Sequence, residues 1–173
     1  MDMHYTCHTI YDQAALTAMA RALRKTVLKK SSRRWWIVGW LVTALGVFAL
    51  LNPQESLPLR VANLAAVVLM LMLQFRRDSL RAWLAKKRAL PGTELCSTSF
   101  YPDYYECKIA GASTRWGYDK ILRLVDTKEY IIFAMGKNHG QVYQKSQLKG
   151  GSVDSFCSFL EQKTGKSMEH LDA

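Results

Sequence analysis

WWIVGWLVTALGVFALL at residues 35–51 and VANLAAVVLMLMLQF at residues 61–75 are two apolar stretches that flank a nine-residue polar break. Neither stretch contains Asp, Glu, Lys or Arg. Two apolar helices joined by so short a connection are typical of a membrane hairpin. The sequence therefore predicts a transmembrane helical hairpin over residues 35–75, with its helices at 35–51 and about 57–75.

Clusters of Lys and Arg flank only the outer ends of this hairpin. Seven basic residues and no acid lie between residues 21 and 34, and six more basic residues lie between 76 and 88. Under the positive-inside rule, the more basic side faces the cytoplasm. We therefore expect a two-pass protein of the cell (plasma) membrane with both termini cytoplasmic. The residues expected to orient it and to lie at the interface are Arg33, Arg34, Trp35, Trp36, Arg76, Arg77 and Trp83.

The length of the stretches leaves a second interpretation open. Seventeen helical residues rise about 25 Å and fifteen rise about 22 Å, against a hydrocarbon core of about 30 Å. The second span becomes long enough if it begins near Leu57, with Pro58 in its first turn. The alternative is a helical hairpin buried inside a soluble protein. Gly39 and Gly46 fit both interpretations, because small residues let two helices approach closely.

The net charge of +10 comes from the half of the chain that flanks the hairpin. Residues 1–88 contain 14 Lys and Arg against 4 Asp and Glu, whereas residues 89–173 contain 10 of each. A nucleic-acid-binding domain would carry a basic surface of its own. The distribution therefore argues against a nucleic-acid partner and favours contact of the basic flanks with anionic phospholipid. The four cysteines lack CxxC spacing and are expected to be free thiols.

Residues 1–34 are predicted to contain a strand at 4–10 and a basic amphipathic helix that Asp12 caps. Apolar residues recur in this helix at helical spacing from Leu16 to Val27, and the basic residues occupy its other faces. Two placements remain open for this helix. It lies on the membrane surface and leads into the first span, or it packs on the soluble domain.

After the hairpin, residues 76–92 are predicted to form a basic juxtamembrane helix that ends at Pro91. From residue 93 the pattern changes to short runs rich in Tyr, Ile, Val, Thr and Phe, separated by turn residues. These runs predict an antiparallel meander of about six strands, at residues 94–101, 104–110, 113–117, 121–126, 130–135 and 141–144. A helix with Ser152 as its N-cap follows over residues 152–164.

Many short strands followed by one amphipathic helix indicate a small curved sheet whose open end or face is covered by that helix. We therefore predict an α+β membrane protein. It consists of a two-helix transmembrane hairpin and a small antiparallel β-domain with a C-terminal helix, residues 93–173.

Three motifs of the β-domain follow one another closely: TRWGYDKI at residues 114–121, LVDT at 124–127 and YIIF at 130–133. With the two apolar stretches before them, they resemble the YcxB-like family, and the resemblance covers nearly the whole chain. The next run, VYQKSQL at 142–148, departs from the family pattern at Gln144 and Leu148. The resemblance implies two membrane helices followed by a domain like pleckstrin-homology (PH) domains. The family is largely uncharacterised and implies no catalytic residues.

The residues that carry chemistry form no recognisable catalytic or metal site. The nucleophile elbow, the phosphate-binding loop and the dinucleotide fingerprint are missing from the sequence. His4, Cys7 and His8 are candidate metal ligands, but on a strand Cys7 points away from the two histidines. A site would need a further ligand such as His139 or Cys107. We expect no enzyme activity, no metal and no cofactor.

The β-domain offers a candidate surface for a partner or ligand, because exposed aromatic residues often anchor protein contacts. Some of its aromatic residues are expected to fill the core and the others to cover the rim. The candidate residues, with the basic side chains near them, are Tyr101, Tyr104, Tyr105, Lys108, Arg115, Trp116 and Lys120.

We expect a non-enzymatic, membrane-anchored protein that displays this domain at the cytoplasmic face and binds another protein through the sheet surface or by strand addition. Two alternatives remain open. One is an immunity-type protein that neutralises a toxin, and the other is a sensor that binds anionic lipid head groups through Lys108, Arg115 and Lys120. A homo-oligomer formed through Gly39 and Gly46 is compatible with all three.

Overall fold

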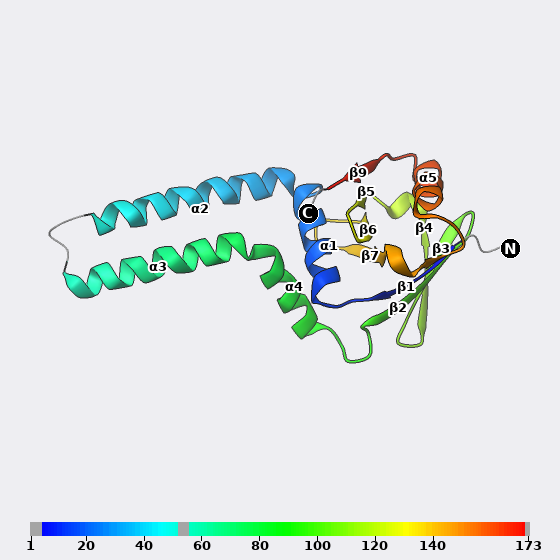
Figure 1. Ribbon diagram of the computed structural model, residues 1–173, viewed down its shortest axis with the longest axis horizontal. Helices are drawn as coiled ribbons and strands as arrows, with labels where there is room; N and C mark the ends of the chain where they lie inside the picture. The colour runs from blue at the N-terminus through cyan, green and yellow to red at the C-terminus, as the bar shows by residue number, and fades with distance from the viewer. Residues whose placement is uncertain (1–4, 52–55, 172–173) are drawn as a thin grey trace.

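The computed structural model describes residues 5–51 and 56–171. A long helical hairpin projects from one side of a β-domain (Figure 1). In the sequence, the hairpin and two shorter helices lie between the first two strands, β1 (Tyr5–Ile10) and β2 (Leu95–Phe100), which are neighbours in one sheet. The N-terminal segment therefore contributes a strand to the β-domain, although the sequence analysis set residues 1–34 apart.

The larger sheet has five strands in the order β4-β3-β2-β1-β8. β3 (Tyr104–Ile109), β4 (Ala112–Gly117) and β8 (Leu148–Lys149) join β1 and β2, and all neighbours are antiparallel. Buried residues alternate with more exposed ones along β1, β2 and β3. One face of this sheet therefore lies on a core and the other faces outward.

The smaller sheet has the order β7-β6-β5-β9. It consists of β5 (Arg123–Asp126), β6 (Tyr130–Ala134), β7 (Gly140–Gln144) and β9 (Met168–His170), and the β5–β9 pair is parallel. The six strands predicted between residues 94 and 144 all form close to their predicted positions. They belong to two sheets rather than to one meander, because the short 3-10 helix η1 (Tyr118–Lys120) separates β4 from β5.

The main core lies between the two sheets and α5 (Val153–Thr164). Phe156 of α5 contacts Phe100 of the larger sheet, with ring centroids 4.8 Å apart, and Phe133 of the smaller sheet contacts Tyr143 at 4.7 Å. These rings and Leu160 are buried together, so α5 closes the space between the sheets. Burial of such aromatic side chains supplies a large share of the stability of a small domain.

Both ends of α5 agree with the sequence prediction. The Ser152 hydroxyl accepts a hydrogen bond from the backbone N–H of Ser155 at 3.1 Å, and Gly165 ends the helix with a φ of 65°. A left-handed residue at this position is favourable only for Gly, which has no Cβ to clash. The two sheets, together with the helices packed on them, confirm the predicted α+β class.

The helix α1 (Gln13–Lys25) covers the other face of the smaller sheet. Ala15 and Ala22 pack with Val125, Ile132 and Val142, so β6 is buried on both faces. Asp12 caps the helix as predicted, because its Oδ1 accepts a hydrogen bond from the Ala15 N–H at 2.7 Å. Of the two placements left open for this helix, the structure shows packing on the β-domain.

The hairpin consists of α2 (Lys29–Leu50) and α3 (Leu57–Phe75), and α4 (Arg77–Arg88) follows it and packs on α1. The helices α2 and α3 are long and apolar enough to cross a membrane, rising about 33 Å and about 28 Å. α3 begins where predicted, with Pro58 in its first turn. α2 begins six residues before the predicted span, because the basic residues that precede Trp35 are helical as well.

Candidate functional site

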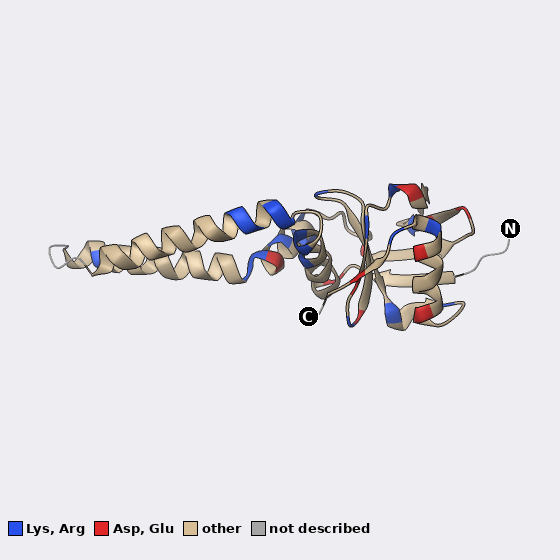
Figure 2. Cartoon of the chain, turned by 90° about the horizontal axis from the view of Figure 1, so that it is seen from above, with Lys and Arg blue, Asp and Glu red and all other residues tan. Residues whose placement is uncertain are grey.

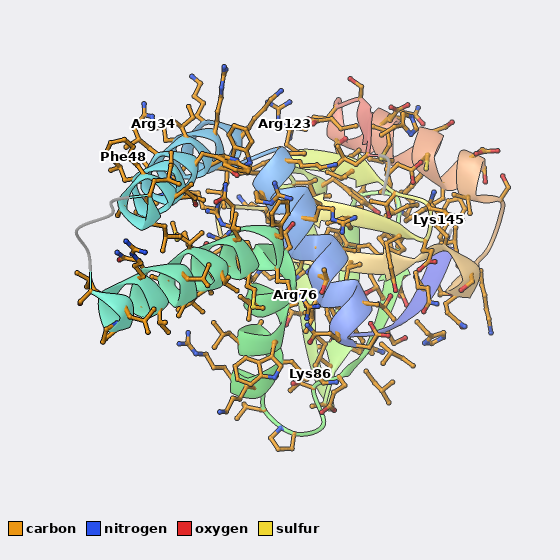
Figure 3. All side chains as sticks on the ribbon, turned by 60° about the vertical axis from the view of Figure 1, so that its left-hand side comes forward. Arg34, Phe48, Arg76, Lys86, Arg123 and Lys145 are labelled. Atoms are coloured by element: carbon orange, nitrogen blue, oxygen red, sulfur yellow. The ribbon has the colours of Figure 1, made fainter. Side chains whose placement is uncertain are left out.

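The hairpin carries its apolar side chains on the outside. Phe48 and Phe75 are each 77% exposed and Trp35 is 64% exposed. Figure 3 shows the side chains of both helices, Phe48 among them, projecting away from the helix pair. A hairpin in a soluble core would bury these residues, so the alternative of a buried hairpin does not fit the structure.

Small residues line the inner side of α2. A Cβ added at Gly46 would lie 2.6 Å from Val67 Cγ2, and one added at Gly39 would lie 2.8 Å from Gln74 Oε1. Thr43, between them, is buried, and its hydroxyl donates to the Gly39 carbonyl at 2.8 Å. The two glycines thus allow α2 and α3 to approach each other. Because α3 of the same chain covers them, they are not available for the homo-oligomer contact that the sequence suggested.

Basic residues gather where the hairpin meets the β-domain, as the blue segments of the cartoon in Figure 2 show. Arg33, Arg34 and Arg76 are exposed there, whereas Arg77 is half-buried. The interface tryptophans expected from the sequence, Trp35, Trp36 and Trp83, are all exposed on the surface of the same region. Each residue predicted to orient the hairpin therefore lies at its base or just beyond it.

A single carboxylate lies in this basic region. Asp78 accepts hydrogen bonds from Arg24 at the end of α1, with Nε 2.8 Å from Oδ1 and Nη2 2.7 Å from Oδ2. This two-point contact raises the pKa of Arg24. Sequence reasoning did not identify the pair. The only signal was that Asp78 is the one acid among the basic residues 76–88.

An apolar cavity of about 760 Å³ lies beside this ion pair, between the base of the hairpin and α4. Its lining comes from all four helices: Arg24 of α1, Ser32, Trp35, Trp36 and Gly39 of α2, Met70, Leu73, Gln74 and Phe75 of α3, and Arg77, Asp78, Leu80, Arg81 and Leu84 of α4. Burial lowers the pKa of Arg77, and the nearby charges of Arg81 and Arg24 lower it further. The cavity therefore combines apolar walls with an excess of positive charge.

The outward face of the larger sheet carries part of the predicted partner surface. Tyr104 stacks on Tyr101 with centroids 4.8 Å apart, and the Arg115 guanidinium lies 5.0 Å from the Tyr104 ring. Stacking of this kind holds a flexible Arg side chain over an aromatic face. Glu106 on β3 lies opposite Arg115 on β4, with its carboxylate 3.9 Å from Arg115 Nε. The group forms a compact, mixed aromatic and charged surface.

Two of the predicted surface aromatics lie elsewhere. Tyr105 is fully buried, because it follows Tyr104 on β3 and successive strand residues point to opposite faces. Including Tyr105 in the partner surface was therefore wrong. Trp116 is half-buried against the core, and its ring lies 5.9 Å from that of His139.

The three cations of the proposed head-group pocket do not converge on one another. Arg115 is paired with Glu106, and Lys120 on η1 has its Nζ 2.9 Å from Asp119 Oδ2. Lys108 lines a cavity with His8 and Gln147, and neither Arg115 nor Lys120 lines that cavity. The described residues thus give the lipid-sensor alternative no shared pocket.

The edge strand β4 exposes backbone groups. Among the described residues β3 is its only strand neighbour, and the register pairs Ile109 with Ala112 beside the two-residue turn Ala110-Gly111. In such a hairpin the pair next to the turn is hydrogen-bonded and the pairs then alternate. The N–H groups of Ser113 and Arg115 therefore point away from β3, towards the open edge.

The interior of the β-domain contains a group of thiols. The Thr98 hydroxyl lies 3.5 Å from the Sγ atoms of both Cys96 and Cys107. The hydrogen bond between the two thiols lowers the pKa of Cys96, and the same bond together with burial raises the pKa of Cys107. Cys96 is only 4% exposed. All four cysteines are free, as expected.

The metal ligands considered from the sequence are only partly within the structure. His4 lies outside the described residues. Cys7 is buried and His8 is exposed on the opposite face of β1. In the described parts of the chain, no group of three or more His, Cys, Asp and Glu side chains is arranged to hold a metal ion.

Comparison with protein-family models, with curated proteins and with solved structures finds no match for this chain. Two regions stand out, the base of the apolar hairpin and the open edge of the larger sheet.

Proposed function

We propose that this chain is a membrane-anchored interaction protein of the YcxB-like type. The hairpin crosses the cell membrane twice, and the β-domain, a PH-like domain, lies on the cytoplasmic side and binds another protein. The exposed apolar side chains of α2 and α3 carry this proposal. An apolar surface of this extent is not tolerated in water and marks a contact with lipid or with another apolar surface.

The distribution of charge supports the proposed orientation. Arg33 and Arg34 lie near the start of α2, and Arg76 and Arg77 follow the end of α3. Figure 2 shows the basic residues of this region in blue where the hairpin meets the β-domain. The positive-inside rule assigns such an end to the cytoplasm. The connection at the far end of the hairpin would then face outward.

Two introduced cysteines test this topology. Ser158 on α5 and Ser56 before α3 are both exposed, whereas native Cys7, Cys96 and Cys107 are buried. In a Cys157→Ser background, Ser158→Cys should react with an impermeant maleimide only after the cells are permeabilised. Ser56→Cys should react in intact cells. The opposite pattern would reverse the orientation, and release of the protein from membranes by alkaline carbonate would refute membrane insertion.

The architecture supports a PH-like β-domain. The larger sheet receives four of its strands, β1 to β4, in simple sequence order, the smaller sheet receives β5 to β7, and α5 closes one end. In this proposal the membrane hairpin is an insertion between the first two strands of the domain. The insertion fixes the domain to the membrane at a short distance, which raises its effective concentration near membrane partners.

For partner binding, the open edge of β4 supports strand addition. Ser113→Pro removes an N–H that points outward while the backbone pairing with β3 stays, and Pro is tolerated on edge strands for this reason. It also removes the Ser113 hydroxyl, which donates a hydrogen bond to Glu106 on β3. Ser113→Ala keeps the N–H but removes the same hydroxyl, so it is the matched control. After cross-linking in cells, recovery of a partner should be similar with the parent and with Ser113→Ala, and about fivefold lower with Ser113→Pro. Equal recovery with all three proteins would contradict binding at this edge.

A further inference from the structure

The cavity at the base of the hairpin is lined by both charged and apolar side chains. The charged ones are Arg24, Arg77, Arg81 and the carboxylate Asp78. The apolar ones include Trp36, Leu73 and Leu84 from three different helices. A ligand that fills such a space needs a charged end and a hydrocarbon end.

The charges in the cavity are not balanced by the protein. Arg24 occupies both oxygens of Asp78. In the part of the chain that the structure describes, no carboxylate lies within ion-pair distance of Arg77 or Arg81. Arg77 is also half-buried, and the nearby carboxylate of Asp78 already binds Arg24 through both oxygens. Among the described residues Arg77 therefore has no ion-pair partner of its own, which is unfavourable for a partly desolvated cation. The guanidinium groups of Arg77 and Arg81 thus favour the binding of an anion in the cavity.

We propose that this cavity binds one anionic phospholipid, with its phosphate at Arg77 and Arg81 and an acyl chain between α2, α3 and α4. The site rests on the proposed membrane insertion of the hairpin. Arg is suited to phosphate because its planar guanidinium donates two parallel hydrogen bonds. Basic pockets between membrane helices on the cytoplasmic side are known sites for anionic lipid head groups.

Size and position are consistent with a phospholipid. A volume of about 760 Å³ exceeds the space that a phosphate ion alone would fill and is in the range of cavities that hold organic ligands. The exposed residues Trp35 and Trp36 line the same cavity as the arginines. Tryptophan at the head-group level is typical of a membrane interface, where phosphate and acyl chain meet.

The site also explains why the ion pair of Arg24 and Asp78 lies at this place. Asp78 holds Arg24, which leaves Arg77 and Arg81 to face the cavity. Without this carboxylate, three guanidinium groups would repel one another at the same point. With it, the cavity carries two free positive charges, which one phospholipid phosphate partly neutralises.

Native mass spectrometry of the full chain in detergent tests the proposal. The protein is titrated with phosphatidylglycerol, with phosphatidylcholine and with inorganic phosphate. The variant Arg77→Gln with Arg81→Gln is compared with Arg33→Gln with Arg34→Gln, which removes the same charge from exposed positions outside the cavity. One phosphatidylglycerol should remain bound to the parent and to the control pair, and its affinity for the cavity variant should fall about 25-fold.

Three results would overturn the site. The first is equal retention of phosphatidylcholine and phosphatidylglycerol by the parent protein. The second is an equal loss of phosphatidylglycerol affinity in the two Gln pairs. The third is binding of inorganic phosphate as strong as that of phosphatidylglycerol. Arg77→Lys with Arg81→Lys keeps the charge but loses the two parallel hydrogen bonds. This pair should still prefer phosphatidylglycerol to phosphatidylcholine, with an affinity below that of the parent, and it keeps the test decisive if the Gln pair fails to fold. Carbonate extraction of every variant separates the two proposals. A protein that stays in the membrane without discriminating between lipids refutes only the lipid site, whereas a protein released by carbonate refutes membrane insertion as well.

Discussion

Arg24 and Asp78 join the hairpin to the β-domain. The carboxylate of Asp78, in the first turn of α4, receives two hydrogen bonds from the guanidinium of Arg24, in the last turn of α1. α1 lies on the smaller sheet, and α4 continues directly from the hairpin. The pair therefore connects the part of the chain that we assign to the membrane with the part that we assign to the cytoplasm.

Asp78→Ala should lower the free energy of unfolding of the full chain in detergent by about 2 kcal/mol, because it removes two charge-assisted hydrogen bonds and leaves a partly buried Arg24 without its acceptor. Thermal unfolding followed by circular dichroism measures the change. A double-mutant cycle with Arg24→Ala should give a coupling of about 1 kcal/mol. Arg33→Ala, at an exposed position, is the control. A coupling indistinguishable from zero would show that the contact does not hold the helices together.

The turn between β3 and β4 contains a residue in an unfavourable conformation. Ala110 has a φ of 50° and Gly111 a φ of 82°, so both central residues of this type I′ turn are left-handed. Ala110→Asn gives the Asn-Gly pair that this turn favours and should stabilise the protein by about 1 kcal/mol. The melting temperature measures the gain, and Ala112→Asn, on the strand, should give none. A lower melting temperature for Ala110→Asn would contradict the turn assignment.

The strands were predictable because their signals are local. Turn residues such as Pro102 and Gly111 separate short β-branched and aromatic runs, and helix ends such as Ser152 and Gly165 are marked by single residues. Each of these signals depends on the backbone preference of one or two residues and not on distant contacts. The positions of β2 to β7 and of α5 therefore follow from the sequence.

The arrangement of the strands was not predictable in the same way. Ile10 pairs with Leu95, although the whole helical region separates them in the chain. Nothing in the run of residues 5–10 identifies its partner strand, and no residue near η1 shows that the sheet ends there. Pairing of this kind depends on the shape of the complete core.

The candidate surface was predicted only in part for a related reason. Tyr104 and Tyr105 are identical neighbours, and one lies on the surface while the other is buried. Alternation along a strand separates them, but a shift of one residue would exchange their roles. The sequence contains both possibilities, and the packing of Tyr105 on Phe100, with stacked rings 5.8 Å apart, decides between them.

The contact between α2 and α3 depends on Gly46. A Cβ at this position would lie 2.6 Å from Val67 Cγ2, so Gly46→Leu must push the helices apart. We expect a loss of about 1–3 kcal/mol in unfolding free energy in detergent. Ala44→Leu, at an exposed position on the same helix, should have little effect. Gly46→Ala combined with Val67→Ala should recover most of the stability lost in Gly46→Ala alone, and a failure to do so would place the clash elsewhere.

Cys157 should report its surroundings through the pH dependence of its alkylation. Burial and the nearby carboxylate of Asp126 together raise the pKa of its thiol to about 11, although Lys145 opposes the shift. Only the thiolate reacts, so the rate with iodoacetamide, followed by peptide mass spectrometry, should rise about tenfold per pH unit from pH 8 to 10. Asp126→Asn should lower the pKa and speed the reaction at pH 8, whereas Glu106→Gln, far from Cys157, should leave it unchanged. A rate that levels off near pH 9 in the parent protein would show that the thiol is not desolvated.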